Sequence, residues 1–257
     1  PGLRVVNQVY DHRVGWINRY DAELARLIDA HIGCNEKICR AYEERGVPRE
    51  RIYRIGHGID TRQFDPALYP EERRRAVREQ IGLPPGSKVV TFMGRLHPQK
   101  RPMDFVELAR RFVNDPAVTF LMVGDGPLAG TVDSVLQRVK LRNFVRRPFL
   151  KAADVLAVTD VLVLPSEYEG MPMVILEVQS MGKPVVVTDV GNAREIIETS
   201  GGGVVVGSIG DVNALAEGVK AMLENPPDPV RVREAVVANF DVRRIAHAYK
   251  RALLGEG

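Results

Sequence analysis

Two short apolar runs on either side of one helical pattern constrain the fold of this chain more than any other feature. Residues 161–164 and 184–189 are rich in valine, as buried β-strands are; the first stops at a proline and the second at an aspartate. Between them, a helix is expected to begin near Pro172 and to end by Gly182. A strand, a helix and a strand in this order predict a parallel sheet, and such sheets bind ligands at the carboxyl ends of their strands.

Two carboxylates mark this unit. Glu169 lies in the loop before the helix, and Glu177 is the only charged residue in the helix, which is otherwise almost entirely apolar. A helix with so wide an apolar surface is expected to be buried, and a carboxylate there is costly unless a hydrogen-bond donor meets it. Two interpretations of Glu177 stay open: a ligand contact, or a glutamate on the one helical stripe that faces solvent.

From Lys88 onward, strand and helix patterns alternate regularly. The predicted strands cover 89–93, 118–123, 144–146, 161–164, 184–189 and 203–206, and helices are expected from Pro102, up to Lys140, around Asp154, from 192 to 198 and from Asp211 to Leu223. This alternation implies right-handed crossovers and an α/β fold with a doubly wound parallel sheet.

The segment before Lys88 is different. We expect a strand at 3–9, helices at 21–30 and 35–45, and a strand at 51–55, which are too few strands for an independent sheet domain. The domain organisation follows as a partial second α/β domain over 1–60, a linker with one charged helix (71–80) over 61–87, the doubly wound domain over 88–240, and a C-terminal helix over 241–257, which follows another amphipathic helix at 229–238.

Composition excludes few classes. Hydrophobic residues make up 45% of the chain, which is ample for a core, and a net charge of +3 fits anionic small ligands or a membrane surface as well as nucleic acid. The charged run at 71–80 lacks aromatic residues among its arginines, so we expect a solvated face and no nucleic-acid partner. Two cysteines, Cys34 and Cys39, leave a structural pair open but favour reduced thiols in a cytoplasmic protein. Neither a membrane span nor a signal peptide is visible. A start at Pro1 is expected of a processed or truncated product.

The loop after the first regular strand combines a glycine with two cations. Gly94 lets the backbone approach a ligand closely, and Arg95 and Lys100 stand near the start of the helix at Pro102, where an anion is already favoured. The arrangement suits a diphosphate, although it is neither a Walker loop nor a dinucleotide Gly-x-Gly-x-x-Gly motif. A glycine-rich turn, 124–127, follows the next strand and is generic by itself.

Taken together, these motifs resemble the retaining glycosyltransferases of the GT-B fold, family 4. The matching residues are Gly94-Arg95-Leu96 with Lys100, Gly124-Asp125-Gly126-Pro127, Pro165-Ser166 followed by Glu169-Gly170 and Glu177, and Gly182-Lys183-Pro184-Val185-Val186. The resemblance covers about 88–225, and 35–65 also fits as the end of the family's first domain. Three short departures stand out: Met171-Pro172, Val178-Gln179-Ser180, and Asn192 in place of the second glycine of a common pair.

The resemblance implies a donor site for a UDP- or GDP-sugar. Arg95 and Lys100 would neutralise the diphosphate, Glu169 would contact the transferred sugar and Glu177 the ribose hydroxyls. The family further implies contacts from Gly94 and from Gly170, Met171 and Pro172 at the helix start. It also places near the base the turn with Gly124, Asp125 and Gly126, together with residues 146–149, which begin at Arg146. No Asp-x-Asp motif is present, so neither a metal nor another cofactor is expected.

The expected activity is transfer of a sugar, with retention of configuration, to a saccharide, lipid or other acceptor in glycan, glycolipid or glycoconjugate biosynthesis. Peripheral contact with a membrane fits such an acceptor. The alternative is a truncated or split-enzyme nucleotide-sugar-binding module without activity of its own, because the family's first domain is incomplete here. His12 follows Asp11 in a pattern unlike the family's active-site histidine and is expected to be structural or exposed. No acid–base set for an epimerase and no pyridoxal lysine for a phosphorylase can be placed.

Overall fold

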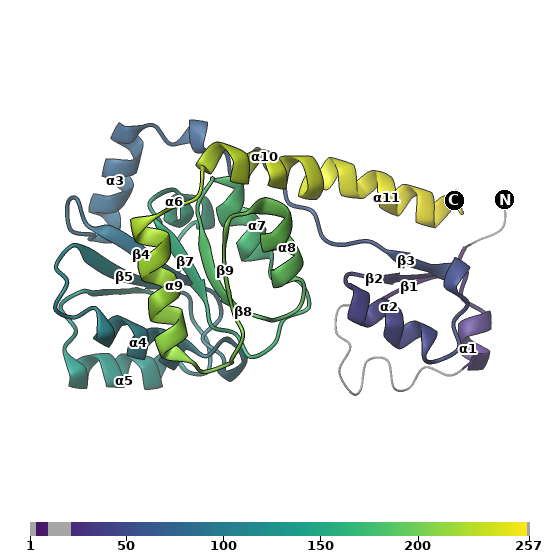
Figure 1. The fold of residues 1–257 in the computed structure, drawn as a ribbon, viewed down its shortest axis with the longest axis horizontal. Coiled ribbons are helices and arrows are strands. Elements are labelled where there is room, and N and C mark those ends of the chain that lie inside the picture. Colours follow the sequence, from purple (N-terminus) through teal and green to yellow (C-terminus); the bar gives the residue numbers. More distant parts are fainter. Residues whose placement is uncertain (1–3, 10–21, 256–257) are drawn as a thin grey trace.

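The computed structural model describes residues 4–9 and 22–255, which form two lobes (Figure 1). The larger lobe is built on a six-stranded parallel sheet with the strand order β6-β5-β4-β7-β8-β9. Its strands are β4 (Lys88–Met93), β5 (Val118–Val123), β6 (Phe144–Arg147), β7 (Val161–Leu164), β8 (Val185–Thr188) and β9 (Gly203–Val206). The chain runs outward from β4 through β5 and β6 and then returns to the other side of β4, so the predicted doubly wound fold is confirmed.

Both faces of this sheet are covered, because successive side chains of a strand point to opposite faces. On one face, Phe92 and Phe120 pack around Phe105, and the covering helices are α4 (Pro102–Arg111), α5 (Ala129–Val139) and α9 (Val212–Glu224). On the other face, Val185 and Val187 pack beneath α6 (Ala152–Ala157), α7 (Met173–Ser180), α8 (Ala193–Ser200) and α10 (Pro229–Phe240). These strands therefore appear in the sequence as continuous apolar runs rather than alternating ones.

The charged helix predicted inside the linker exists as α3 (Glu71–Ile81), and it is part of the larger lobe. Val77 and Ile81 are buried with Leu83 against Leu121 and Val155. The helix thus keeps one apolar stripe for the core, while most of its arginines and glutamates face solvent.

The small lobe is a three-stranded parallel sheet, β1 (Val6–Val9), β2 (Ala30–Gly33) and β3 (Ile52–Arg54), in that order. Its helices are α1 (Ala22–Arg26) and α2 (Glu36–Glu43), and a short 3-10 turn lies at Arg49–Arg51. Two further 3-10 turns lie outside the small lobe, at Pro66–Leu68 before α3 and at Pro98–Lys100 between β4 and α4. The predicted helix over 21–30 is wrong at its end, because Ala30 belongs to β2, which lies between β1 and β3 and is buried along its length. Cys34 and Cys39 are free and buried. The Asp11-His12 pair lies outside the described residues.

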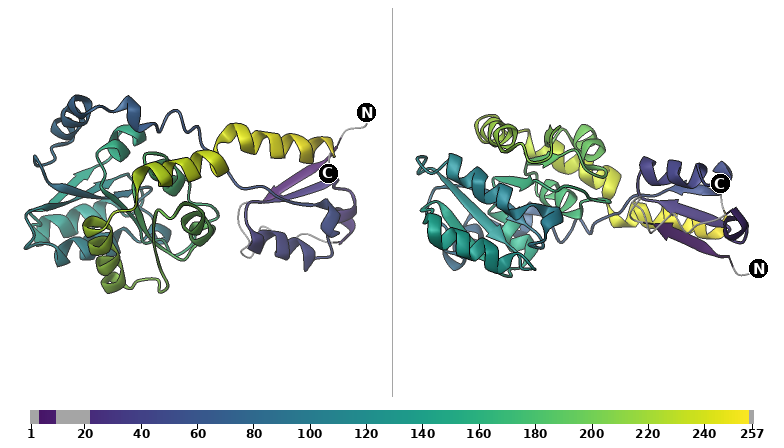
Figure 2. Two further views of the ribbon diagram at one scale, coloured as in Figure 1. Left: turned by 45° about the horizontal axis from the view of Figure 1, so that its top comes forward. Right: turned by 90° about the horizontal axis from the view of Figure 1, so that it is seen from below.

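The last helix, α11 (Val242–Leu254), extends from the end of α10 onto the small lobe (Figure 2). Ile245, Tyr249 and Ala252 pack there against Ile32 and Ile55. The C-terminal helix therefore supplies part of the small lobe's core. Within residues 4–9 and 22–255, no helix is both long enough and apolar enough to cross a membrane.

The two segments that cross between the lobes pair with each other. The Ile59 N–H donates to the Phe240 carbonyl at 3.0 Å, and the Val242 N–H donates to the Ile59 carbonyl at 2.8 Å. Beside them the Thr61 hydroxyl donates to Oδ2 of the buried Asp241 at 2.6 Å, and the Arg243 guanidinium donates to both carboxylate oxygens. These hydrogen bonds hold the pKa of Asp241 well below its usual range, despite its burial.

Candidate functional site

The candidate site lies where the winding direction of the large sheet reverses. β4 has β5 on one side and β7 on the other, so the loops that follow these strands diverge and leave room for a ligand at their carboxyl ends. A cavity of about 920 Å³ lies there, a size suited to a small-molecule ligand. It is lined by Met93, Gly94, Arg95, Lys100, Val123, Gly124, Asp125, Gly126, Pro148, Phe149, Leu150, Ala152, Glu169, Met171, Pro172, Met173, Val174 and Glu177.

Two glycines in the lining let the loops after β4 and β5 touch backbone to backbone. Gly124 has φ +143°, and a Cβ atom there would lie 1.8 Å from the Gly94 carbonyl oxygen. A Cβ atom on Gly126 would lie 2.7 Å from the Leu96 carbonyl oxygen, and the Leu96 N–H donates to the Asp125 carbonyl at 2.8 Å. A side chain at either glycine would push the loops apart. A Cβ atom on Gly94, in contrast, would meet open space.

Lys100 and Glu169 meet from different loops. The Lys100 Nζ lies 2.5 Å from Glu169 Oε1, and their side chains are only 22% and 9% exposed. The same two loops are joined next to this pair, because Gln99 donates from its side chain to the Tyr168 carbonyl at 2.8 Å and accepts from the Glu167 N–H at 2.8 Å. The pairing brings together two residues that are 69 positions apart in sequence.

Arg95 and Glu177 are charged cavity residues whose side chains have no partner among the described residues. The Arg95 side chain is exposed and forms no hydrogen bond or ion pair with any described residue. The Glu177 side chain is half-buried in the cavity wall and likewise has no such partner among the described residues. Burial raises the pKa of the Glu177 carboxyl. Its place in the cavity favours a ligand contact over the solvent-facing stripe.

The beginning of α7 forms one wall. Met171, Pro172, Met173 and Val174 line the cavity, and the first N–H groups of a helix have no acceptor within the helix. These groups and the helix dipole favour an anion or a hydroxyl oxygen. Gly170 lies just outside the wall, since its carbonyl oxygen accepts a hydrogen bond from Asn35 Nδ2 of the small lobe at 3.2 Å.

Arg146 does not line the cavity, although the family resemblance implied a contact near the base. Its side chain lies beside α5, with Nε 3.4 Å from Asp133 Oδ1, because Arg146 is inside β6 rather than in the loop after it. The loop residues Pro148, Phe149 and Leu150 reach the cavity instead, and Phe149 is 76% exposed at its edge.

The apolar wall formed by Leu150, Ala152, Met173 and Val174 had no role in the sequence-based site. Its signal in the sequence was the set of apolar residues that directly follow a predicted strand or begin a predicted helix. The cavity therefore combines an apolar wall with two cations, Arg95 and Lys100, and three carboxylates, Asp125, Glu169 and Glu177. Among residues 4–9 and 22–255, no group of three or more histidine, cysteine, aspartate or glutamate side chains could hold a metal ion.

Comparison with known proteins identifies the family. Residues 87–225, more than half of the chain, match the sequence model described as glycosyl transferases group 1. The chain belongs to this family. Membership confirms the resemblance drawn from the motifs, and it places the cavity loops after β4, β5, β6 and β7 inside the matched region.

Two curated relatives match most of the chain. Alpha-maltose-1-phosphate synthase of Mycolicibacterium smegmatis is 30% identical over 87% of this chain and 59% of its own length. UDP-Gal:alpha-D-GlcNAc-diphosphoundecaprenol alpha-1,3-galactosyltransferase of Escherichia coli is 29% identical over 88% of this chain and 59% of its own length. The chain thus spans about three fifths of each of these relatives.

Solved structures share the arrangement of both lobes. Alr3699/HepE of Anabaena, in complex with UDP and glucose, superposes with a TM-score of 0.82 at 21% identity and covers 98% of this chain and 71% of its own. A glycosyltransferase from Rickettsia africae ESF-5 gives a TM-score of 0.83 at 19% identity, with the same two coverages. At such identities the likeness is one of fold, and it supports the α/β GT-B architecture.

Proposed function

We propose that the chain is the donor-binding part of a retaining hexosyltransferase that uses a UDP- or GDP-sugar. One observation carries the proposal: Arg95, Lys100, Glu169 and Glu177 come from separate loops and one helix and meet in a single cavity at the switch point of the sheet. The names of the relatives support it, because one uses a UDP-sugar and a structural neighbour binds UDP and glucose.

The diphosphate lies between Arg95 and Lys100 in this proposal. As the bond between the sugar and the phosphate breaks, negative charge grows on the departing diphosphate, and fixed cations beside it stabilise that charge. Arg95 has no competing partner among the described residues, while Lys100 is already held in place by Glu169. The two cations take the part that a divalent metal plays in other transferases, so the reaction is proposed to need none.

The two carboxylates recognise hydroxyl groups at opposite ends of the donor. Glu177 accepts from the ribose hydroxyls, which replaces the hydrogen bonds its carboxylate lost on burial. Glu169 keeps Oε1 on Lys100 and offers its second oxygen to a hydroxyl of the transferred sugar. The N–H groups at the start of α7 contact the sugar or the phosphate.

Retention is proposed to follow front-face attack, in which the departing phosphate helps to deprotonate the acceptor hydroxyl. The acceptor is a saccharide, a lipid or a comparable molecule, and the product belongs to glycan, glycolipid or glycoconjugate biosynthesis. Action in the cytoplasm, with peripheral contact to a membrane for a lipid acceptor, completes the proposal.

Lys100→Ala tests the phosphate assignment. We expect it to weaken binding of the nucleotide-sugar about 10- to 100-fold, because a charge-assisted contact to the diphosphate is lost. Arg101→Ala is the matched control: Arg101 is the next residue, carries the same charge and pairs with Asp104 outside the cavity. Calorimetric titration measures both variants. Unchanged affinity of Lys100→Ala, or equal losses in both, would contradict the assignment.

A further inference from the structure

The loop that carries Glu169 is held on both sides by groups outside the cavity. On one side, Asn35 Nδ2 of the small lobe donates to the Gly170 carbonyl at 3.2 Å. On the other side, a Cβ atom on Gly191 would lie 2.3 Å from the Gly170 carbonyl oxygen and 2.7 Å from that of Glu169, so these carbonyls lie directly against the loop after β8. The backbone at 169–170 therefore has little room to move unless its neighbours move too.

Asn192, the residue after Gly191, makes the reciprocal contact. Its side chain is buried, and its Nδ2 donates to the Cys34 carbonyl of the small lobe at 3.0 Å. The Asn35 amide therefore reaches from the small lobe to Gly170 of the large lobe. The Asn192 amide reaches in the opposite direction, from the large lobe to Cys34, which precedes Asn35. The Asn192 Oδ1 is buried without a hydrogen-bond partner among the described residues, so the bonds donated by Nδ2, to Cys34 and at 3.5 Å to Glu195 Oε2, fix this side chain.

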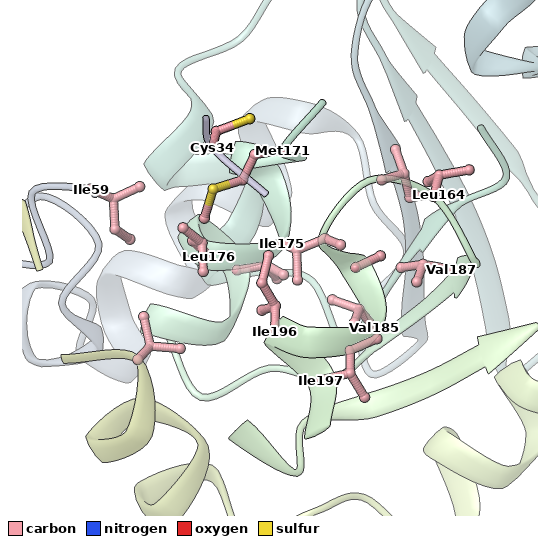
Figure 3. Packing of buried hydrophobic residues seen from close by; sticks show 14 of the residues in the cluster. Cys34, Ile59, Leu164, Met171, Ile175, Leu176, Val185, Val187, Ile196 and Ile197 are labelled. Atoms are coloured by element: carbon pink, nitrogen blue, oxygen red, sulfur yellow. The ribbon is translucent and has the colours of Figure 1, made fainter. Parts of the chain in front are cut away.

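Met171 closes the contact from the cavity side. Its sulfur accepts a hydrogen bond from the His57 N–H at 3.0 Å, and its side chain packs beside Cys34 in the shared core of the two lobes (Figure 3). Consecutive residues 170 and 171 thus both contact the small lobe, while the carboxylate of Glu169 is tied to Lys100 in the large lobe.

We propose that Asn35 and Asn192 are positioning residues for the sugar end of the donor site, and that they couple the placement of Glu169 to the arrangement of the two lobes. This inference rests on the proposed function. No described residue of the small lobe lines the cavity, so the part that would hold the nucleotide belongs to the large lobe alone. A displacement of the small lobe would move the 169–171 backbone and leave Arg95 and Glu177 in place.

Asn35→Asp separates positioning from folding. Asn35 also caps α2, because its Oδ1 accepts from the Ile38 N–H at 2.9 Å, and an aspartate keeps that acceptor. It replaces the amide donor with a carboxylate oxygen that faces the Gly170 carbonyl. Asn192→Asp makes the corresponding change against the Cys34 carbonyl. Arg54→Gln is the control, because it breaks an exposed ion pair with Glu195 that joins the same lobes and leaves the Glu195 carboxylate in place beside Asn192.

Hydrogen exchange judges the proposal without any ligand. In Asn35→Asp we expect the amides of Glu167 and Ile175, the hydrogen-bonded amides on either side of the loop, to exchange about tenfold faster than in the parent chain, since loss of one anchoring hydrogen bond lowers the cost of local opening. The amides of β4 and β5 serve as the internal reference, and Arg54→Gln should match the parent. Unchanged exchange at Glu167 and Ile175 in both aspartate variants would overturn the proposal.

Binding then tests the link to the sugar. UDP with UDP-glucose, and GDP with GDP-mannose, are the probes. Both aspartate variants should weaken the nucleotide-sugar about tenfold and leave the plain nucleotide unchanged, because only the sugar contacts depend on the 169–171 backbone. Equal weakening of both ligands would show a merely structural role. If the parent chain binds none of the probes, the proposed function fails, and the exchange result alone decides whether the amides position the loop.

Discussion

The large and the small lobe bury their sheets in different ways. The six strands of the large lobe are covered on both faces by helices that lie between them in sequence or directly beside them. The three strands of the small lobe depend for part of their core on α11, which starts at the end of the large lobe's last helix. The candidate site is lined wholly by described residues of the large lobe.

The residues that would bind the nucleotide therefore belong to one lobe, and the residues proposed to position the sugar-binding loop connect that lobe to the other. Arg95 and Glu177, which would bind the nucleotide part of a donor, are placed by the large lobe and need nothing from the small lobe. The small lobe acts on the site through a few hydrogen bonds around Asn35 and Asn192, and it is held in place by the paired crossing segments at Ile59 and Asp241. Substitutions should therefore be able to change the stability of the small lobe without unfolding the large lobe, or nucleotide binding by the large lobe without changing the small lobe.

Ala252→Asp should produce the largest difference in stability between the two lobes. Ala252 is fully buried in the cluster that joins α11 to Ile32 and Ile55, and an unpaired carboxylate there should cost about 4 kcal/mol of the small lobe's stability. Urea unfolding followed by hydrogen exchange should show the strands of the small lobe opening first, with β4 and β5 still protected. Leu253→Asp, at an exposed position of the same helix, should have little effect. Simultaneous loss of protection in both lobes would contradict the separation.

Asp241→Asn tests the joint between the lobes. Replacing this buried, hydrogen-bonded carboxylate should lower the free energy of unfolding by about 2 kcal/mol at neutral pH. Because the pKa of Asp241 is lowered in the folded chain, the unfolded chain binds more protons, and stability rises with pH in that range. The contribution is fully present above the ordinary aspartate pKa and is lost as the pH falls from about 5 toward 2.

The two proteins should therefore converge in stability in acid, as measured by urea unfolding at a series of pH values. Parallel curves for the parent and the Asp241→Asn variant would show that the carboxylate charge is not what stabilises the joint.

Glu177→Gln should have the smallest effect, confined to the large lobe. Burial raises the pKa of Glu177, and ribose hydroxyls favour the ionised form, so nucleotide affinity should rise with pH above the ordinary glutamate value of about 4.3. The variant should lose this dependence and bind about tenfold more weakly at pH 7. Glu167→Gln, an exposed carboxylate of the neighbouring loop, is the control. Identical pH profiles for the parent and Glu177→Gln would exclude the ribose contact.

Much of the large lobe could be predicted from the sequence. The strands at 161–164 and 203–206 have the predicted bounds, since buried parallel strands are uninterrupted β-branched runs between clear stop signals. The meeting of Arg95, Lys100, Glu169 and Glu177 was also predictable, because the carboxyl ends of parallel strands lie at one edge of a sheet.

The remainder depends on contacts that no local pattern encodes. β2 contains His31 and Gly33 and resembles no typical strand, and its burial comes from β1, β3 and a helix more than two hundred residues later. Asn192 appeared in the sequence only as a departure from a common glycine pair, since its partner Cys34 is 158 positions away. Arg146 was assigned to the site by family position, whereas its place inside β6 turns it toward α5.

The most direct measurement is a calorimetric titration of the unmodified chain with UDP, GDP and ADP and their sugar conjugates, with a metal chelator present. We expect at least one nucleotide and its sugar conjugate to bind without a divalent metal, because Arg95 and Lys100 already supply the positive charge. No binding of any nucleotide, or binding that appears only when a divalent metal is added, would contradict this expectation.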